Sequence, residues 1–256
     1  NIRDNVGYFK DMEKNSLKLL KNKYKGMAPV YLIGAGPSLK DNIEELKKKK
    51  GIKIVCSHAL KFCLANGLRP DYVIVVDAKK YEQRDFLNVD CEGMRLIADI
   101  GVDHEALRRW SRRGGHIYWF RMSTYREIDR LVERLTDFDY TVTAGGSVMT
   151  FASILAQGMG FKKAVFVGVD LCDKSYADGK PIRKRLDKYV IDTCDIHGMH
   201  QRVLPQFYLY KYFLEVFTGT QKKIEWINAC GRGILGSYVQ GNLKWIRQMK
   251  LEEISG

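Results

Sequence analysis

The sequence predicts a doubly wound, Rossmann-like α/β fold, with a mostly parallel sheet and helices on both faces. Short runs rich in Val and Ile recur along the chain, and segments with helical periodicity lie between most of them. Continuous apolar runs that alternate with helices are typical of parallel strands buried on both faces. The chain has 256 residues, of which 45% are hydrophobic, and this suffices for one substantial core.

In chain order, we expect an N-terminal helical arm over residues 1–28, with Leu17, Leu19 and Leu20 as its apolar contacts. A Rossmann-like nucleotide-binding core follows over residues 29–171. Residues 172–256 are expected to complete the same domain with a lid loop, a helix and a final strand and helix. The expected strands are Val30–Ile33, Lys53–Cys56, Tyr72–Val76, Arg95–Ala98, Ile117–Phe120, Ala164–Val167 and Lys223–Ile227. The expected helices are Lys40–Lys49, Leu60–Asn66, His104–Trp110, Tyr125–Leu135, Val148–Gly158 and Phe207–Phe217.

The stretch Cys172–Gln201 interrupts this alternation. It is polar, and it carries Tyr176, Arg183 and the pair His197 and His200. A long insertion without secondary structure inside a compact domain is typically a lid, a binding loop or a disordered segment. We therefore predict a structureless lid that closes over a bound ligand.

The formal net charge of +13 favours anionic partners such as nucleotides, nucleic acid or a lipid surface. No apolar run approaches the roughly 20 residues of a membrane span, and the polar first residues do not resemble a secretory signal. Six cysteines without a Cys-x-x-Cys pair predict reduced thiols and a cytoplasmic protein. Peripheral membrane contact and a homo-oligomer both stay open.

Ligands of open α/β sheets bind at the carboxyl ends of the strands. A glycine turn follows the first expected strand, where glycine lets the backbone approach a ligand and the next helix offers free N–H groups to an anion. We expect this turn to bind a nucleotide, and a side chain at Gly36 to block binding while leaving the fold intact. The turn lacks a third glycine and a P-loop lysine, and Ser57 and His58 stand after the second strand, where dinucleotide sites have an acidic residue, so a tight connection without a ligand is the alternative. Its residues are Gly34, Ala35, Gly36, Pro37 and Ser38.

Three further segments follow expected strands or open an expected helix. Asp77 ends the third strand, where it can accept ribose hydroxyls, orient a metal or cap the next helix. Gly145, Gly146 and Ser147 form a second glycine turn at a helix start, suited to phosphate. Asp170 follows the strand Ala164–Val167. We predict that these segments and the first turn line one continuous pocket.

The two histidines of the insertion are candidates for proton transfer, because histidine titrates near neutral pH. His200 and, second, His197 are predicted as catalytic. Two alternatives stay open: both are ordinary loop histidines, or Cys194, His197 and His200 bind zinc, although no fourth ligand is evident. Our prediction is that no metal is bound.

Four motifs together resemble the MptE-like family, which includes an archaeal 6-hydroxymethylpterin diphosphokinase and the motility-accessory-factor glycosyltransferases of flagellin. The motifs span residues 29 to 172. They are Gly34-Ala-Gly-Pro-Ser-Leu39, Leu68-Arg-Pro-Asp-Tyr72 leading into Asp77, Gly145-Gly-Ser-Val148 and Val167-Gly-Val-Asp-Leu171. The resemblance implies a nucleotide-dependent transferase.

The same motifs are similar to those of bacterial CMP-sialic acid transferases. That similarity implies a CMP-type nucleotide sugar as donor, with the first glycine turn near the nucleotide and Ser147 near its phosphate or sugar. It also implies that Tyr176 contacts phosphate and that His200 is the base. Ala35 stands where those transferases have Asn, and Val75-Val-Asp-Ala-Lys79 stands where the archaeal kinases have paired aspartates that would hold magnesium.

Three functions follow as hypotheses. The first is a glycosyltransferase that uses a CMP-type sugar as donor and a hydroxyl-bearing or anionic molecule as acceptor. Arg183 would steady the leaving phosphate of the donor. The second is a pyrophosphokinase that transfers diphosphate from ATP to a pterin-like alcohol, with magnesium at Asp77 and Asp170. The third is a non-catalytic nucleotide- or nucleic-acid-binding protein; nucleic acid is not favoured, because no recognised motif accompanies the charge.

Overall fold

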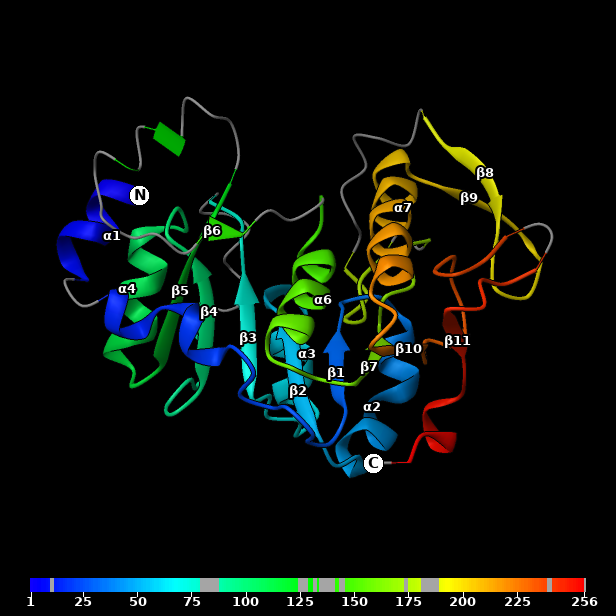
Figure 1. Cartoon of the computed structure of the whole chain (residues 1–256), viewed down its shortest axis with the longest axis horizontal. Coiled ribbons are helices and arrows are strands. Elements are labelled where there is room, and N and C mark those ends of the chain that lie inside the picture. Colours follow the sequence, from blue (N-terminus) through cyan, green and yellow to red (C-terminus); the bar gives the residue numbers. More distant parts are fainter. Residues whose placement is uncertain are drawn as a thin grey trace.

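In the computed structural model, the described part of the chain forms one nine-stranded sheet in the order β11-β10-β7-β1-β2-β3-β4-β5-β6 (Figure 1). Every neighbouring pair in this sheet is parallel, so the predicted α/β class is confirmed. The structure describes residues 1–9, 12–78, 88–123, 129–130, 133, 141–142, 146–172, 175–180, 189–238 and 241–255. The strands of the sheet are β1 Val30–Ile33, β2 Ile52–Cys56, β3 Tyr72–Val75, β4 Arg95–Asp99, β5 His116–Met122, β6 Thr141–Val142, β7 Lys163–Val167, β10 Glu225–Asn228 and β11 Ile246–Gln248.

The central strands are apolar on both faces because helices cover both faces. All four residues of β1 are buried, and so are the last four of β7. Val30 pairs with Ile52 of β2 on one side and with Ala164 of β7 on the other. Burial on both faces is the reason that the strand sequences read as continuous rather than alternating apolar runs.

Helices α6 and α7 lie in front of the sheet in Figure 1. Parallel crossovers are right-handed, so the direction in which the chain moves across the sheet decides which face a connecting helix covers. The connections that contain α2, α3 and α4 run from β1 toward β6, whereas those that contain α6 and α7 run toward β10. Helices α2, α3 and α4 therefore cover the other face. In α2 the buried Leu39, Ile43 and Leu46 face the sheet, and Lys47 and Lys48 lie in the last turn. The helices are α1 Ile2–Tyr8, α2 Ser38–Lys48, α3 Ser57–Ala65, α4 His104–Arg112, α6 Val148–Gly158 and α7 Pro205–Thr220.

The chain reverses its direction across the sheet between β1 and β7. Strands β1 to β6 proceed to one edge, and the chain then returns to place β7 beside β1. Such a switch point leaves a crevice outside the carboxyl ends of the two strands, where ligands of this fold class bind. The turns after β1 and after β7 therefore meet in the place where a ligand is expected.

The N-terminal arm is less helical than expected. Only α1 is an α-helix, and it is followed by two short 3₁₀ turns at Glu13–Asn15 and Leu17–Leu20. Leu17 and Leu20 are buried as predicted, whereas Leu19 is exposed. A 3₁₀ turn has three residues per turn, so the side chains of Leu17 and Leu20 lie on the same face and that of Leu19 does not.

The insertion after β7 is not structureless. Its described part contains a hairpin of β8 Ile191–Cys194 and β9 His200–Val203, in which Cys194 pairs with His200. The alternation of β-branched and polar residues in Ile191–Cys194 is the signal that was missed. Beyond the hairpin, β10 and β11 join the main sheet. Among the described residues, no helix has the length and apolarity that a membrane crossing requires.

Candidate functional site

A cavity of about 420 Å³ opens at the carboxyl ends of the central strands. Its walls are the turns after β1 and β7, the N-termini of α3 and α6, and the first turns of α7. The lining residues are Gly34, Ala35, Gly36, Pro37, Cys56, His58, Val76, Asp77, Met122, Gly146, Ser147, Val148, Met149, Gly168, Val169, Asp170, Leu171, Cys172, Ser175, Tyr176, Gln206, Phe207 and Tyr210. Both glycine turns predicted from the sequence thus border the same space, as far as they are described.

The glycine turn after β1 packs directly on the turn after β7. The N–H of Gly36 donates to the carbonyl of Gly168 at 2.8 Å. A Cβ atom on Gly36 would lie 2.5 Å from Oδ2 of Asp170 and 2.8 Å from the oxygen of Gly168. A side chain on Gly36 would therefore disturb backbone packing, so the expectation that it leaves the fold intact is wrong, whereas the approach of this turn to a ligand stays a prediction.

Asp170 holds the start of α2. Its Oδ2 accepts the N–H of Ser38 at 2.8 Å, and both residues are almost completely buried. A carboxylate here stabilises the positive end of the helix dipole. Ser38 is not among the residues that line the cavity. The N-terminus of α2 is thus already engaged by a carboxylate of the protein itself.

The N-terminus of α6 faces the cavity differently. Gly146 has φ of +66°, a backbone conformation that favours glycine. Oγ of Ser147 accepts the N–H of Thr150 at 3.2 Å. Val148 and Met149, the first two helical residues, line the cavity, and N–H groups at these positions have no partner within their own helix. Gly145, the third residue predicted for this turn, lies outside the described residues.

An aromatic pair and a carboxylate occupy the other walls. The ring of His58 stacks on the ring of Tyr176, with centroids 5.4 Å apart and an interplanar angle of 21°. Asp77 lies at the end of β3 and is exposed. Burial raises the pKa of Tyr210, and the charge of Asp77 raises it further. Tyr176 and Asp77, both predicted from the sequence, thus lie in one cavity with His58.

The histidines of the hairpin lie elsewhere. Nε2 of His200 is 2.8 Å from Oδ1 of Asp192, and Nε2 of His197 is 3.0 Å from the carbonyl of Gly231. Neither histidine is among the residues that line the cavity. Arg183 lies outside the described residues. Their catalytic roles stay predictions. Within the described ranges, no group of three His, Cys, Asp or Glu residues is arranged to hold a metal.

Sequence reasoning missed the wall that α7 contributes. Gln206, Phe207 and Tyr210 line the cavity, although the strand before this helix, β9, belongs to the hairpin and not to the main sheet. The rule of inspecting the ends of strands cannot find such residues, because α7 reaches the site by packing against α6. His58 was missed for another reason: it follows β2, at the position where a dinucleotide site has an acidic residue.

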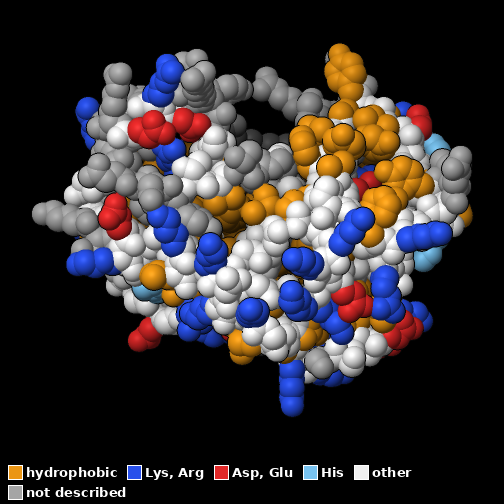
Figure 2. Space-filling view, viewed as in Figure 1, with side chains coloured by type: hydrophobic (Ala, Val, Ile, Leu, Met, Phe, Trp, Pro, Cys, Tyr) orange, Lys and Arg blue, Asp and Glu red, His pale blue; other side chains and the backbone are white. Residues whose placement is uncertain are grey.

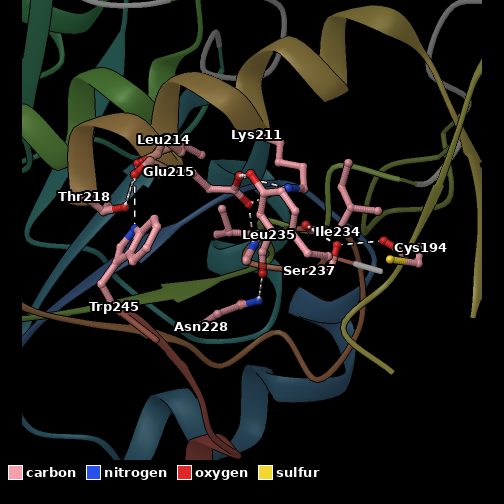
Figure 3. Close-up of polar contacts among 12 residues, drawn as sticks. Cys194, Lys211, Leu214, Glu215, Thr218, Asn228, Ile234, Leu235, Ser237 and Trp245 are labelled. Carbon is pink, nitrogen blue, oxygen red and sulfur yellow. Dashed lines mark hydrogen bonds and ion pairs between the residues drawn. The ribbon is translucent and has the colours of Figure 1, made fainter. Parts of the chain in front are cut away.

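Polar contacts anchor α7 to the loop that follows β10 (Figure 3). The buried carboxylate of Glu215 contacts Nζ of Lys211 at 2.7 Å, the N–H of Gly236 at 2.8 Å and the hydroxyl of Tyr238 at 3.1 Å. Nε1 of Trp245 donates to the carbonyl of Glu215 at 3.2 Å. Burial raises the pKa of Glu215, and the Lys211 ammonium and these donors oppose that rise.

The outer surface of α7 and its surroundings is apolar. Figure 2 shows hydrophobic side chains gathered over α7, at the upper right of the view. Such a contiguous exposed apolar surface is typical of a contact site for another molecule. This apolar surface begins at Tyr208, directly after the cavity-lining Phe207. The exposed large side chains are Tyr208, Leu209, Tyr212, Val216, Tyr238 and Trp245.

Asp99, at the end of β4, fixes the segment that carries the cavity-lining Met122. Its carboxylate accepts the N–H of Met122 at 2.6 Å and that of Gly101 at 2.7 Å. Burial raises the pKa of Asp99 to about 6, from an ordinary value of 3.8; the two N–H groups and Arg121 oppose this rise.

Asp99 is therefore expected to make stability depend on pH. The pKa of Asp99 is higher in the folded state than in the unfolded state. The stabilisation that its protonated carboxyl contributes is therefore fully present below pH 3.8 and is lost as pH rises through about 6. We expect the free energy of unfolding of the wild type to fall relative to Asp99→Asn, by up to about 3 kcal/mol between pH 4 and pH 7. Urea denaturation of both proteins at the two pH values measures this. A difference that does not change with pH would contradict it.

Comparison with known proteins adds two findings. Residues 3–175 match the family described as 6-hydroxymethylpterin diphosphokinase MptE-like. The fold is similar to that of the MAf glycosyltransferase from Magnetospirillum magneticum AMB-1, with a TM-score of 0.70 and 18% identity. The similarity covers 98% of this chain and 40% of that one, so this chain spans less than half the length of that glycosyltransferase. No curated protein matches the sequence.

Proposed function

This chain belongs to the MptE-like family, and from that premise we propose that it is a transferase that binds a nucleotide in the cavity between β1 and β7. The observation that carries the proposal is the position of the cavity at the switch point of the sheet. The N-terminus of α6 and the turns after β1 and β7 supply backbone groups there, and aromatic side chains supply walls for a ring or a sugar.

We expect the phosphate of the nucleotide to bind at α6 rather than at α2. The buried Asp170 carboxylate already accepts the N–H of Ser38, and it would repel a second anion at the start of α2. At α6 the first two helical residues, Val148 and Met149, line the cavity and have N–H groups without a partner in their own helix, and the capping group there is the uncharged hydroxyl of Ser147. The first glycine turn then shapes the pocket, and the second one orients the anion.

A glycosyl group carried by a CMP-type nucleotide is the transferred group that we favour. The fold is shared with a glycosyltransferase, and the four sequence motifs are similar to those of CMP-sialic acid transferases. Stabilisation of the leaving phosphate by preorganised donors would be the main catalytic contribution. The net charge of +13 suits an anionic donor and a hydroxyl-bearing or anionic acceptor.

Diphosphate transfer to a pterin-like alcohol is the second candidate, because the family carries the name of such a kinase. That reaction would use magnesium held by carboxylates. The described residues do not fit this well: the carboxylate of Asp170 is buried against α2, which leaves Asp77 as the exposed carboxylate of the wall. No step is therefore assigned to magnesium.

A thermal-shift series tests nucleotide binding. We expect CMP to raise the melting temperature more than CDP, UDP, GDP or ATP, each with and without magnesium. A ligand at 100 times its dissociation constant adds about 2.7 kcal/mol to the free energy of unfolding. If ATP with magnesium is the best ligand, the kinase hypothesis replaces this one; if no nucleotide stabilises the protein, both fail.

Two variants at one position test the phosphate site. Val148→Pro removes the first N–H of α6, and proline is tolerated at this position because Ser147 before it is already extended, with φ −138° and ψ 154°. We expect weaker CMP binding and an unchanged fold. Val148→Ala, which keeps the N–H, is the matched control. Equal CMP affinity in the two variants would place the phosphate elsewhere.

A further inference from the structure

All five histidines of the chain are described, and only one of them lines the cavity. Nδ1 of His104 is 2.9 Å from the side-chain oxygen of Asn5, between α4 and α1. His116 begins β5, at the amino end of the sheet, opposite the cavity. His197 and His200 lie on the hairpin, each paired as described above. The lining histidine is His58.

The fold fixes His58 beside the first glycine turn. His58 is the second residue of α3, directly after β2, and β2 is the parallel neighbour of β1. The ring of Tyr176 stacks on it from the segment that follows β7. That segment is pinned to the glycine turn, because the N–H of Ala177 donates to the carbonyl of Ala35 at 2.8 Å.

The loop around Tyr176 is itself ordered by short-range hydrogen bonds. The N–H of Tyr176 donates to the carbonyl of Lys180, and the N–H of Gly179 donates to the carbonyl of Tyr176, both at 2.9 Å. Elements from both sides of the switch point therefore converge on the imidazole of His58. A ring held in this way can present a nitrogen atom to the cavity in a defined direction.

We propose that His58 is the general base of the transfer reaction and that Tyr176 is the positioning residue that orients it. This rests on the proposed function, because it requires donor and acceptor to meet in this cavity. The hydroxyl of the acceptor gives its proton to a ring nitrogen of His58. The acceptor oxygen bonds to the anomeric carbon of the donor as the bond from that carbon to the phosphate oxygen breaks. CMP leaves with the electron pair, and the proton passes from His58 to solvent.

The geometry favours His58 over the other candidates for this role. His200 is exposed, and its Nε2 contacts Asp192 outside the lining of the cavity. Asp77 does line the cavity, but it is solvent-exposed at the end of β3. A base must lie within hydrogen-bond reach of the proton that it removes. Among histidines, only His58 meets this condition for a substrate bound in the cavity.

The first test needs no acceptor. In ¹H–¹³C spectra of the wild type, each histidine gives one Cε1–H signal, and His58→Gln, His200→Gln and His116→Gln identify three of the five by their loss. We expect added CMP to shift the His58 signal and to leave the His116 signal in place. If CMP stabilises the protein but shifts the His200 signal and not that of His58, this inference fails while the proposed function survives. If CMP neither binds nor shifts any signal, the proposed function fails, and the inference fails with it.

The second test measures release of CMP from CMP-sialic acid, with water as acceptor. We expect His58→Gln to lower kcat by about 10² to 10⁴, the usual range for a general base, with a small change in KM and loss of the acidic limb of the pH–rate profile. His116→Gln should behave as wild type. A larger loss of kcat in Asp77→Asn or His200→Gln than in His58→Gln would overturn the assignment.

Variants of Tyr176 separate positioning from phosphate contact. Tyr176→Phe keeps the stacked ring and removes the hydroxyl, whereas Tyr176→Ala removes both. If the ring orients His58, Tyr176→Phe keeps the wild-type kcat and pH–rate profile, and Tyr176→Ala lowers kcat with little change in KM. Equal losses in both variants, with raised KM, would instead show that the hydroxyl binds the donor phosphate, and the positioning role would fail.

Discussion

Gly36→Val is expected to destabilise the folded state strongly rather than only to block ligand binding. Its Cβ would lie 2.5 Å from Oδ2 of Asp170 and 2.8 Å from the carbonyl oxygen of Gly168, so the turns after β1 and β7 would have to separate. Overpacking of this kind typically costs 1–3 kcal/mol. Loss of the hydrogen bond from Ser38 to Asp170 adds about 1–3 kcal/mol, because its acceptor is a buried charged carboxylate. The sum is a large part of a typical stability of about 5–15 kcal/mol.

Urea denaturation followed by circular dichroism measures this effect, and Gly158→Ala is the control. Gly158 ends α6, and a Cβ there would meet no atom within 4 Å. Alanine is favoured over glycine in a helix by up to about 1 kcal/mol, so the control should be as stable as the wild type or more stable. A folded Gly36→Val protein that has lost only nucleotide binding would show that the glycine serves the ligand, as the sequence alone had suggested.

The strands were predictable because burial on both faces leaves a direct mark on the sequence. Val30–Ile33 and Ala164–Val167 are apolar throughout, and both lie at the centre of the sheet as predicted. The hairpin strands Ile191–Cys194 and His200–Val203 were missed because they are partly exposed and outside the main sheet. Two-residue β6 is too short for any periodicity to show.

The glycine turns of the candidate site and some of its side chains, such as Asp77 and Tyr176, were predictable, whereas the contacts of other side chains were not. Glycine turns after strands can be read from the sequence, and Gly34, Gly36 and Gly146 do line the cavity. The direction of a side chain depends on tertiary neighbours. Asp170 was therefore predicted to bind the ligand, although its carboxylate accepts a hydrogen bond from the backbone of α2. His58 was interpreted only as a residue that does not fit a dinucleotide motif, although it lines the cavity.

The ion pair of Lys211 and Glu215 could not be predicted either. At a spacing of four residues, a lysine and a glutamate usually form a solvated pair on a helix surface, worth about 0.3–0.5 kcal/mol. In α7 both side chains are only 4% exposed, because the loop after β10 and the ring of Tyr238 cover them. Because the pair is buried, each charge compensates the other in a place that water does not reach.

Removal of one partner of this pair is expected to cost about 3–5 kcal/mol, because it leaves an uncompensated buried charge. We expect Glu215→Leu to be the more damaging single change, since Glu215 also accepts from Gly236 and Tyr238. Lys211→Met leaves those two donors in place. The double variant, which buries no charge, should recover part of the loss.

A double-mutant cycle by urea denaturation measures the coupling between the two side chains, and Arg109→Met supplies the comparison. Arg109 and Glu105 form a pair at the same spacing on α4, but both are about half exposed, so the change should cost less than about 1 kcal/mol. The loss at α7 should also weaken CMP binding beyond what reduced stability explains, because the same helix places Gln206, Phe207 and Tyr210 in the cavity wall. Additive single effects in the cycle would mean that the contact stabilises nothing. Unchanged CMP affinity in a folded Lys211→Met protein would mean that α7 keeps its place at the cavity without the ion pair.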